Sequence, residues 1–258
     1  MNIALIFASG RGTRMGTEIP KQFLEINGKP IIVHTIELFQ YHPLINKVYV
    51  VTLNEYIPYV EKLKNFYKLE KIKGITAGGD TAQESIYRGL KMIEKENPGD
   101  SIVLLHDGVR PFVSSDVINR NIEGVEQNGN AITCVPAYET IITSKDGNAI
   151  NDVPIRKETY IGQAPQSFYL KDIIKAHDEI RIKNPKYENM VDACTIIRTL
   201  GKTAYIVEGN RGNIKVTTPE DVYTFKAYIK YKENEQTFGL GETNKIGAQF
   251  DMMKNNNF

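Results

Sequence analysis

Short apolar runs alternate with segments of helical spacing along most of this chain. The run from Asn2 to Ala8 is almost wholly apolar, as expected of a parallel strand that helices cover on both faces. Such runs are followed by segments in which apolar residues recur every three or four positions. This alternation predicts a sheet wound on both sides by helices. The expected strands are 2–8, 47–52, 73–77, 101–106, 131–136 and 203–207, and the expected helices are 31–39, 59–67, 82–94, 115–128, 172–181, 193–200 and 219–231.

The alternation is interrupted between about residues 138 and 163. The segments 140–143 and 149–153 flank the sequence Lys-Asp-Gly-Asn, and an Asp-Gly pair between two extended segments predicts a β-hairpin. We expect this hairpin to project from the α/β core as an arm. Residues 234–258 are polar and lack periodicity, which predicts a flexible tail. The expected organisation is one domain over residues 1–233 followed by this tail.

Charge and cysteine content exclude several classes of protein. The 258 residues include 32 Lys and Arg against 31 Asp and Glu, so no overall charge directs the chain to nucleic acid or to a membrane. Cys134 and Cys194 fit no metal-ligand spacing, which favours a reduced cytoplasmic protein. The apolar run at the N-terminus is much shorter than the ~20 residues that a membrane-spanning helix needs. We therefore expect a cytoplasmic protein that binds neither nucleic acid nor membranes.

The loop after the first expected strand combines glycines with basic residues. Gly10 and Gly12 would let backbone N–H groups approach a polyphosphate, and Arg14 and Lys21 would add fixed positive charge. The alternative is a plain strand-to-helix turn with solvated cations. The loop lacks the Gly-Lys-Ser/Thr of a Walker sequence and the third glycine of a dinucleotide-binding fingerprint. From these residues alone we expect an α/β protein that handles phosphate groups.

Further motifs follow this loop along the chain. They are GRGTRMG…PKQFLEINGKPIIVHTIELF, AGGD…ESIYRGL, HDGVRPFV, PAYETI, PIRKETYIGQAPQSF, DACTII and VEGNRGNIKVTTPEDV. In this order they span roughly residues 1–230 and resemble the sugar-alcohol-phosphate cytidylyltransferases, which include the methylerythritol-phosphate and ribitol-5-phosphate enzymes. The resemblance implies a single Rossmann-like nucleotidyltransferase domain, with a mostly parallel mixed sheet, helices on both faces and a projecting β-hairpin arm. It also implies transfer of CMP from CTP to the phosphate of a small sugar alcohol.

The same resemblance implies which residues hold CTP. Attack of a phosphate oxygen on the α-phosphorus builds negative charge, so the enzyme must align two groups and neutralise that charge. By resemblance this is the task of three catalytic cations, Arg14, Lys21 and Lys215. Ala82 stands where the family commonly has an arginine, so the contribution of that arginine is missing or comes from elsewhere. The nucleotide is expected to bind at Ala8, Ser9, Gly10, Gly12, Gly78, Gly79, Asp80 and Ser85.

A second set of residues is assigned by the resemblance to the acceptor. The set comprises Asp107, Arg110, Thr140 and Arg156, and Asp107 is also a candidate ligand of Mg²⁺. Arg156 lies in the expected arm, and the resemblance implies that it reaches the substrate phosphate of the neighbouring subunit in a homodimer. A guanidinium suits this task because it binds phosphate in bidentate fashion. We expect His106 to be a packed histidine, because alternation along the strand directs it away from Asp107.

The identity of the acceptor is open between two branches of the family. Gly108 and Val109 stand where the isoprenoid-pathway enzymes usually have two alanines, and GQAPQ and DAC also look like ribitol-type sequences. We expect ribitol 5-phosphate as acceptor, giving CDP-ribitol for teichoic acid or capsule synthesis. The alternative is 2-C-methyl-D-erythritol 4-phosphate, in isoprenoid biosynthesis. Val191 departs from both branches, because the family usually has Ser or Thr there.

Three other classes of protein fit the sequence less well. A hexose-1-phosphate nucleotidyltransferase shares the fold but usually has a longer first loop and different later motifs. A non-catalytic nucleotide-binding protein would be expected to have lost Arg14, Lys21 or Lys215, and all three are present. An NAD-dependent dehydrogenase would need an acidic residue after the second strand, where Leu53 and Asn54 stand.

Overall fold

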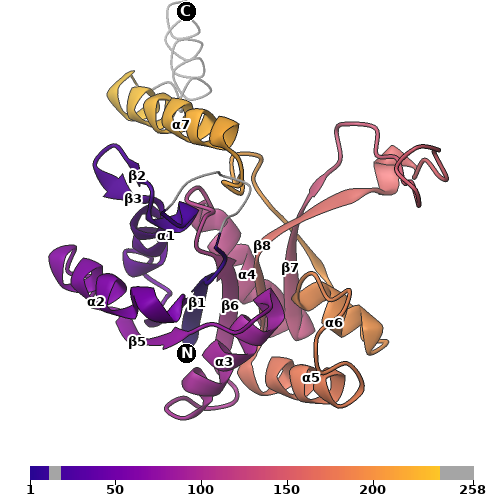
Figure 1. Ribbon diagram of the computed structural model, residues 1–258, viewed down its shortest axis with the longest axis horizontal. Coiled ribbons are helices and arrows are strands. Elements are labelled where there is room, and N and C mark those ends of the chain that lie inside the picture. The colour runs from indigo at the N-terminus through magenta and orange to yellow at the C-terminus, as the bar shows by residue number, and fades with distance from the viewer. Residues whose placement is uncertain (12–18, 239–258) are drawn as a thin grey trace, which may run out of the picture. The chain divides into compact units, whose positions relative to one another are not determined.

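The computed structural model describes residues 1–11 and 19–238 (Figure 1). The chain divides into two compact units, Met1–Thr217 and Thr218–Phe258. In the second unit, helix α7 (Pro219–Phe238) begins with a proline and carries Glu220 and Asp221 in its first turn, where acidic side chains complement the helix dipole. The expected domain boundary at residue 233 falls inside this helix. The remainder of the expected tail, residues 239–258, lies outside the described part of the chain.

A seven-stranded sheet forms the centre of the first unit. Its strands are β1 (Asn2–Ala8), β4 (Lys47–Thr52), β5 (Ile72–Ala77), β6 (Ile102–Asp107), β7 (Asn130–Pro136), β8 (Tyr160–Tyr169) and β9 (Ile206–Glu208). They lie in the order β5-β4-β1-β6-β8-β7-β9. β8 runs antiparallel to both of its neighbours, and the other pairings are parallel. The mostly parallel mixed sheet expected from the sequence is confirmed. Two short strands, β2 (Glu25–Ile26) and β3 (Lys29–Pro30), form a separate pair.

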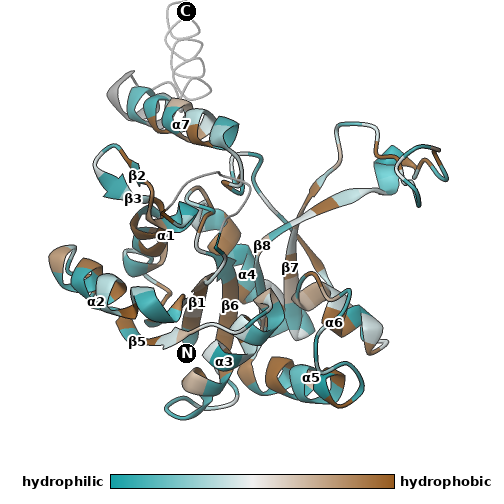
Figure 2. Cartoon of the chain, in the orientation of Figure 1, coloured by the Kyte–Doolittle hydropathy of each residue, from teal (hydrophilic) through white to brown (hydrophobic). Residues whose placement is uncertain are grey.

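Helices cover both faces of this sheet (Figure 1). One face carries α1 (Ile31–Gln40), α2 (Ile57–Phe66) and α4 (Ser115–Asn128), and the other carries α3 (Ala82–Glu94), α5 (Leu170–Lys183) and α6 (Ala193–Thr199). Successive side chains of a strand point to opposite faces, so the two core clusters share each central strand. In β1, Ala4 and Ile6 join the first cluster while Ile3 and Leu5 join the second. The apolar strands therefore lie between two layers of amphipathic helices (Figure 2).

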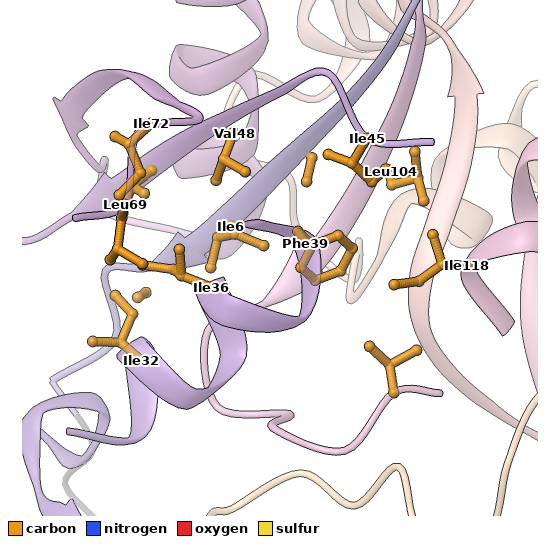
Figure 3. Close-up of a cluster of buried hydrophobic side chains, with 14 of the residues drawn as sticks. Ile6, Ile32, Ile36, Phe39, Ile45, Val48, Leu69, Ile72, Leu104 and Ile118 are labelled. Atoms are coloured by element: carbon orange, nitrogen blue, oxygen red, sulfur yellow. The ribbon is translucent and has the colours of Figure 1, made fainter. Parts of the chain in front are cut away.

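The first cluster shows why the segment 31–39 forms a helix in this place. Ile32, Ile36 and Phe39 recur at helical spacing and are buried against Ile6 of the central strand (Figure 3). Thr35 lies on the same buried helix, and its hydroxyl donates to the carbonyl of Gly108, 3.1 Å away, just after β6. The helix that follows the first loop is thus fixed both by apolar burial and by a bond to the loop after β6.

The arm connects β7 to β8 and projects from the sheet (Figure 1). Its outer part contains a single antiparallel bridge, Thr143 to Asp152, in place of the ladder expected over 140–153. The reason is local: the Asp146 carboxylate accepts from the N–H groups of Asn148 and Ala149, each at 2.9 Å, so a side chain takes the place of cross-strand partners. A short 3₁₀ turn, η4 (Arg156–Glu158), precedes β8.

Candidate active site

The C-terminal ends of β1 and β6 lie side by side near the middle of the sheet. The chain leaves β1 toward β4 on one side, whereas β6 lies on the other side, so the strand order reverses between them. Ligands of open α/β sheets bind outside the strand ends at such a point. A cavity of about 240 Å³ opens there. Residues of both predicted sets line it, namely Ala8, Ser9, Gly10, Lys21, Gly79, Asp80, Ser85, Asp107 and Lys215.

One residue of the predicted nucleotide set lines a different hollow. Gly78 lines a neighbouring hollow together with Ser9 and Gly79, next to the main cavity. Gly12 and Arg14 belong to the segment 12–18, outside the described residues, so their assignments stay predictions.

The chain at Ala8 and Gly10, where the first loop begins, is held by a buried glutamine for which no role was predicted. Gln22 lies in a 3₁₀ turn, η2 (Lys21–Phe23), and its amide nitrogen donates to the carbonyls of Ala8, at 2.7 Å, and Gly10, at 3.1 Å. The turn is itself anchored, because the ring of Phe23 stacks on Tyr56 with centroids 4.5 Å apart. Lys21, next to this glutamine, therefore occupies a fixed position in the cavity wall.

The hydroxyl of Ser85 ties the first loop to the Gly78–Gly79 turn. It accepts from Ser9 Oγ at 2.7 Å and from the Gly79 N–H at 3.0 Å. Ser85 is itself buried, so it sets the positions of these two groups at the cavity. Gly78 is required by this packing, since a Cβ on it would lie 2.4 Å from the Cβ of Ser9.

An arginine for which no role was predicted contacts this turn. The guanidinium of Arg88, in the second turn of α3, donates to the carbonyl of Gly78 at 2.7 Å. Glu84 holds that guanidinium at 3.2 Å and also pairs with Arg181 of α5. Position 82 carries alanine, but the turn still has an arginine contact, supplied from position 88.

Asp107 forms the centre of a charged cluster at the end of β6. Lys215 Nζ lies 2.6 Å from one carboxylate oxygen, and Arg110 Nε lies 2.9 Å from the other. Arg110 also donates to the carbonyl of Asn213 at 2.7 Å, which links the loop after β6 to the segment that carries Lys215. Burial by itself raises the pKa of Asp107, but the charges of Lys215 and Arg110 outweigh it and leave the pKa lowered. The carboxylate is thus ionised and orients two cations at the cavity.

His106 is fully buried, as predicted, and the expectation of a packed histidine is confirmed. Its Nε2 lies 3.0 Å from the carbonyl oxygen of Arg110. Because a carbonyl only accepts, Nε2 carries the proton of a neutral ring. Burial lowers the pKa of His106 to about 4, so the ring stays neutral near pH 7. The histidine fixes the backbone that carries Arg110.

The two arm residues of the predicted acceptor set lie apart from this cluster. Thr140 and Arg156 are exposed, and the cavities around Asp107 do not include them. Within one chain the structure therefore brings together Asp107, Arg110 and Lys215, but not Thr140 or Arg156.

The carboxylates present fit a metal that arrives with substrate. Among the described residues there is no group of three or more His, Cys, Asp or Glu side chains that could enclose an ion. Asp80 and Asp107 both line the main cavity. Mg²⁺ typically keeps one or two carboxylates and completes its shell with water and substrate phosphates. Each oxygen of Asp107 contacts one cation, Lys215 or Arg110, and has a further lone pair with which it could bind the metal.

Over residues 1–11 and 19–238, helices are too short or too polar to cross a membrane.

Comparison with known proteins gives a consistent result. The family model of IspD, 2-C-methyl-D-erythritol 4-phosphate cytidylyltransferase, matches residues 2–231. The chain is 44% identical to the ribitol-5-phosphate cytidylyltransferase of Streptococcus agalactiae serotype V, over 93% of this chain and 100% of that protein. It is 36% identical to the 2-C-methyl-D-erythritol 4-phosphate cytidylyltransferase of Geotalea uraniireducens, over 90% of this chain and 98% of that one. Its fold is similar to the crystal structure of 4-diphosphocytidyl-2C-methyl-D-erythritol synthase from Anaerococcus prevotii, with a TM-score of 0.75, 25% identity and coverage of 89% and 96%. This chain is therefore an enzyme that belongs to the IspD family of cytidylyltransferases.

Proposed function

We propose that the enzyme transfers CMP from CTP to ribitol 5-phosphate, giving CDP-ribitol and pyrophosphate, for teichoic acid or capsule synthesis. The observation that carries this acceptor is the ranking of relatives: 44% identity over 93% of the chain to a ribitol-5-phosphate enzyme, against 36% over 90% and 39% over 86% to two methylerythritol-phosphate enzymes. The loop after β6 agrees with it. A Cβ on Gly108 would lie 2.7 Å from the Cβ of Ala8, so this loop would have to shift to accept the alanine that methylerythritol-phosphate enzymes usually have there.

The site supports this reaction through its charges. The acceptor phosphate is already ionised near neutral pH, so no general base is needed and the neutral, buried His106 has no proton to remove. Lys21 and Lys215 line the cavity in which the triphosphate would lie, and a fixed cation stabilises the charge that develops on the α-phosphate oxygens. Asp80 and Asp107 would hold Mg²⁺, whose chemistry when bound is to neutralise phosphate charge. CTP is a cytoplasmic nucleotide, and we place the reaction in that compartment.

The acceptor assignment is tested by pyrophosphate release with CTP and Mg²⁺. We expect ribitol 5-phosphate to support a kcat/KM at least tenfold above that of 2-C-methyl-D-erythritol 4-phosphate, because the two acceptors differ in hydroxyls that a polar site can read. Faster release with the second acceptor would reverse the assignment within the family. No release with either would remove the proposed reaction altogether.

We also propose that a second copy of the chain completes the site through the arm. The arm exposes apolar side chains that a partner surface would cover, including Ile142, Ile150, Val153 and Ile155. Arg156 stands among them and, in a homodimer, would bind the acceptor phosphate held by the other subunit.

Mixing two inactive variants tests this arrangement. Arg156→Ala and Lys215→Met should each have little activity alone. In a mixed dimer, one of the two sites would combine the intact Lys215 of one subunit with the intact Arg156 of the other. Refolding the variants together should therefore restore activity to as much as about a quarter of the wild-type value, if chains pair at random. Activity no greater than the sum of the separate variants would show that both residues serve the same chain.

A further inference from the structure

A second cavity lies directly beside the nucleotide cavity. It has a volume of about 200 Å³ and shares Phe7, Ala82, Asp107 and Lys215 with its neighbour. Beyond these shared residues it is bounded by the first turn of α3, the end of β6 and the segment that leads into α6. Its additional lining residues include Gln83, Gln166, Val191 and Asp192. Asp107 and Lys215 line both cavities, and the acceptor phosphate would meet CTP beside them.

One polar side chain at this cavity has no hydrogen-bond partner within the described part of the protein. Gln83 is only 1% exposed, yet neither its amide nitrogen nor its amide oxygen has a hydrogen-bond partner among the described residues. Burying an amide in this state is costly, and native proteins leave few such groups. Gln83 is placed in the first turn of α3, which is fixed by the Thr81 cap at Glu84 N, 3.1 Å away. Gln83 therefore borders the cavity with an amide whose nitrogen and oxygen are both unpaired and covered, and a rotation of the side chain would bring them to a ligand.

In the other amide of the cavity, both the nitrogen and the oxygen are hydrogen-bonded. Gln166 Nε2 donates to Asp192 Oδ2 at 2.8 Å, and Gln166 Oε1 accepts from the N–H of Cys194 at 2.9 Å. Asp192 in turn caps α6 by accepting from Thr195 N at 2.8 Å. Two glutamines with the same chemistry thus differ in one respect: Gln166 supports the fold, whereas Gln83 has unused bonding capacity.

We propose that the Gln83 amide binds a hydroxyl of the acceptor's polyol chain and thereby contributes to acceptor choice. The proposal rests on the proposed function and adds a specificity residue to it. The cations of the cluster match the acceptor phosphate, whereas a neutral amide that can donate and accept matches a hydroxyl, which also does both. The apolar Val191 at the same cavity offers no such bond. A site that hydrogen-bonds a hydroxyl discriminates strongly against ligands that lack it, because its own polar group is then left unpaired.

The test replaces Gln83 by methionine, which keeps the length of the side chain and removes both polar atoms. We expect kcat/KM for ribitol 5-phosphate to fall about tenfold, as for loss of one good hydrogen bond, while the KM for CTP changes less than twofold. We also expect the Tm of the free enzyme to stay the same or to rise, because the folded state loses an unpaired buried amide. A residue with a merely structural role would lower the Tm and would not affect one substrate selectively.

Gln166→Met is the matched control, with the same chemical change at the same cavity. It should lower the Tm, because Asp192 and the Cys194 N–H lose their partner. If Gln83→Met lowers the Tm as Gln166→Met does, or leaves the acceptor KM and kcat unchanged, the proposal is overturned. If the wild-type enzyme accepts no polyol phosphate, the proposed function fails and this inference fails with it. That outcome is distinguished from the others because it appears before any variant is made.

Discussion

Replacing Lys215 by methionine is expected to lower kcat at least a hundredfold while the enzyme stays folded. Lys215 lines the cavity, and its Nζ lies 2.6 Å from Asp107, where the α-phosphate of CTP would bind. A fixed charge at the point where charge develops contributes roughly 10²–10³ in kcat, because it acts in the transition state more strongly than in the bound substrate. Steady-state pyrophosphate release at saturating CTP and acceptor measures kcat, and thermal unfolding checks the fold.

A matched lysine separates this effect from the general consequences of losing a charge. Lys91 in α3 has the same exposed side-chain fraction as Lys215, 43%, and is also paired with a carboxylate, that of Glu94. It lies away from both cavities, so Lys91→Met should leave kcat within about twofold, as expected for a surface ion pair. A Lys215→Met enzyme that keeps more than a tenth of the wild-type kcat would show that the lysine serves only to hold Asp107.

Elements marked by local signals were predictable from the sequence. The helix 82–94 and the strand 47–52 have the predicted bounds because their ends are determined by nearby residues. Thr81 caps the helix, and the strand is a short apolar run. β8 was not predicted, because its side chains find partners far along the chain: Ser167 donates to Asn121 and Gln166 to Asp192. Its polar residues are buried by contacts that a local pattern does not contain.

The residues of the site also divide into those that were predictable from the sequence and those that were not. Ser9 and Asp107 could be placed together because the carboxyl ends of parallel strands meet at one edge of a sheet, whereas Lys215 was added to them by the family resemblance. Gln22, Arg88 and Gln83 were not identified, because only the folded chain shows a carbonyl, a turn or an empty polar cavity beside them. The arm is the opposite case, in which residues were assigned to the site but lie away from it in a single chain. Thr140 and Arg156 were assigned to the acceptor by resemblance, yet one chain alone does not bring them to Asp107.

Asp107→Asn is expected to give the largest loss of stability among these variants. The substitution keeps the shape of the side chain and removes the charge that holds Arg110 and Lys215. Removing one partner of a buried ion pair typically costs about 3–5 kcal/mol. Because Lys215 is 43% exposed and its pair is screened by solvent, we expect the lower end, about 3 kcal/mol in the free energy of unfolding at pH 7. Activity should also fall, since neither cation is then oriented.

The pH dependence of unfolding decides whether the stability lost in Asp107→Asn comes from the missing charge or from a changed shape. The folded-state pKa of Asp107 is lowered, so its contribution to stability is present above the unfolded-state pKa of about 4 and is lost as the pH falls through the folded-state value. The difference in unfolding free energy between wild type and Asp107→Asn should therefore be largest near neutral pH and should shrink in acid, where the wild-type carboxyl is also neutral. Urea denaturation at about pH 7, 5 and 3 measures this difference in unfolding free energy.

Asp178→Asn is the control, at an exposed carboxylate bonded to the Tyr87 hydroxyl. This variant should change stability little at any of these pH values. A difference for Asp107→Asn that stays constant down to pH 3 would mean that the amide fails to fit the pocket for geometric reasons. The charge of Asp107 would then not be what holds Lys215 and Arg110 at the site.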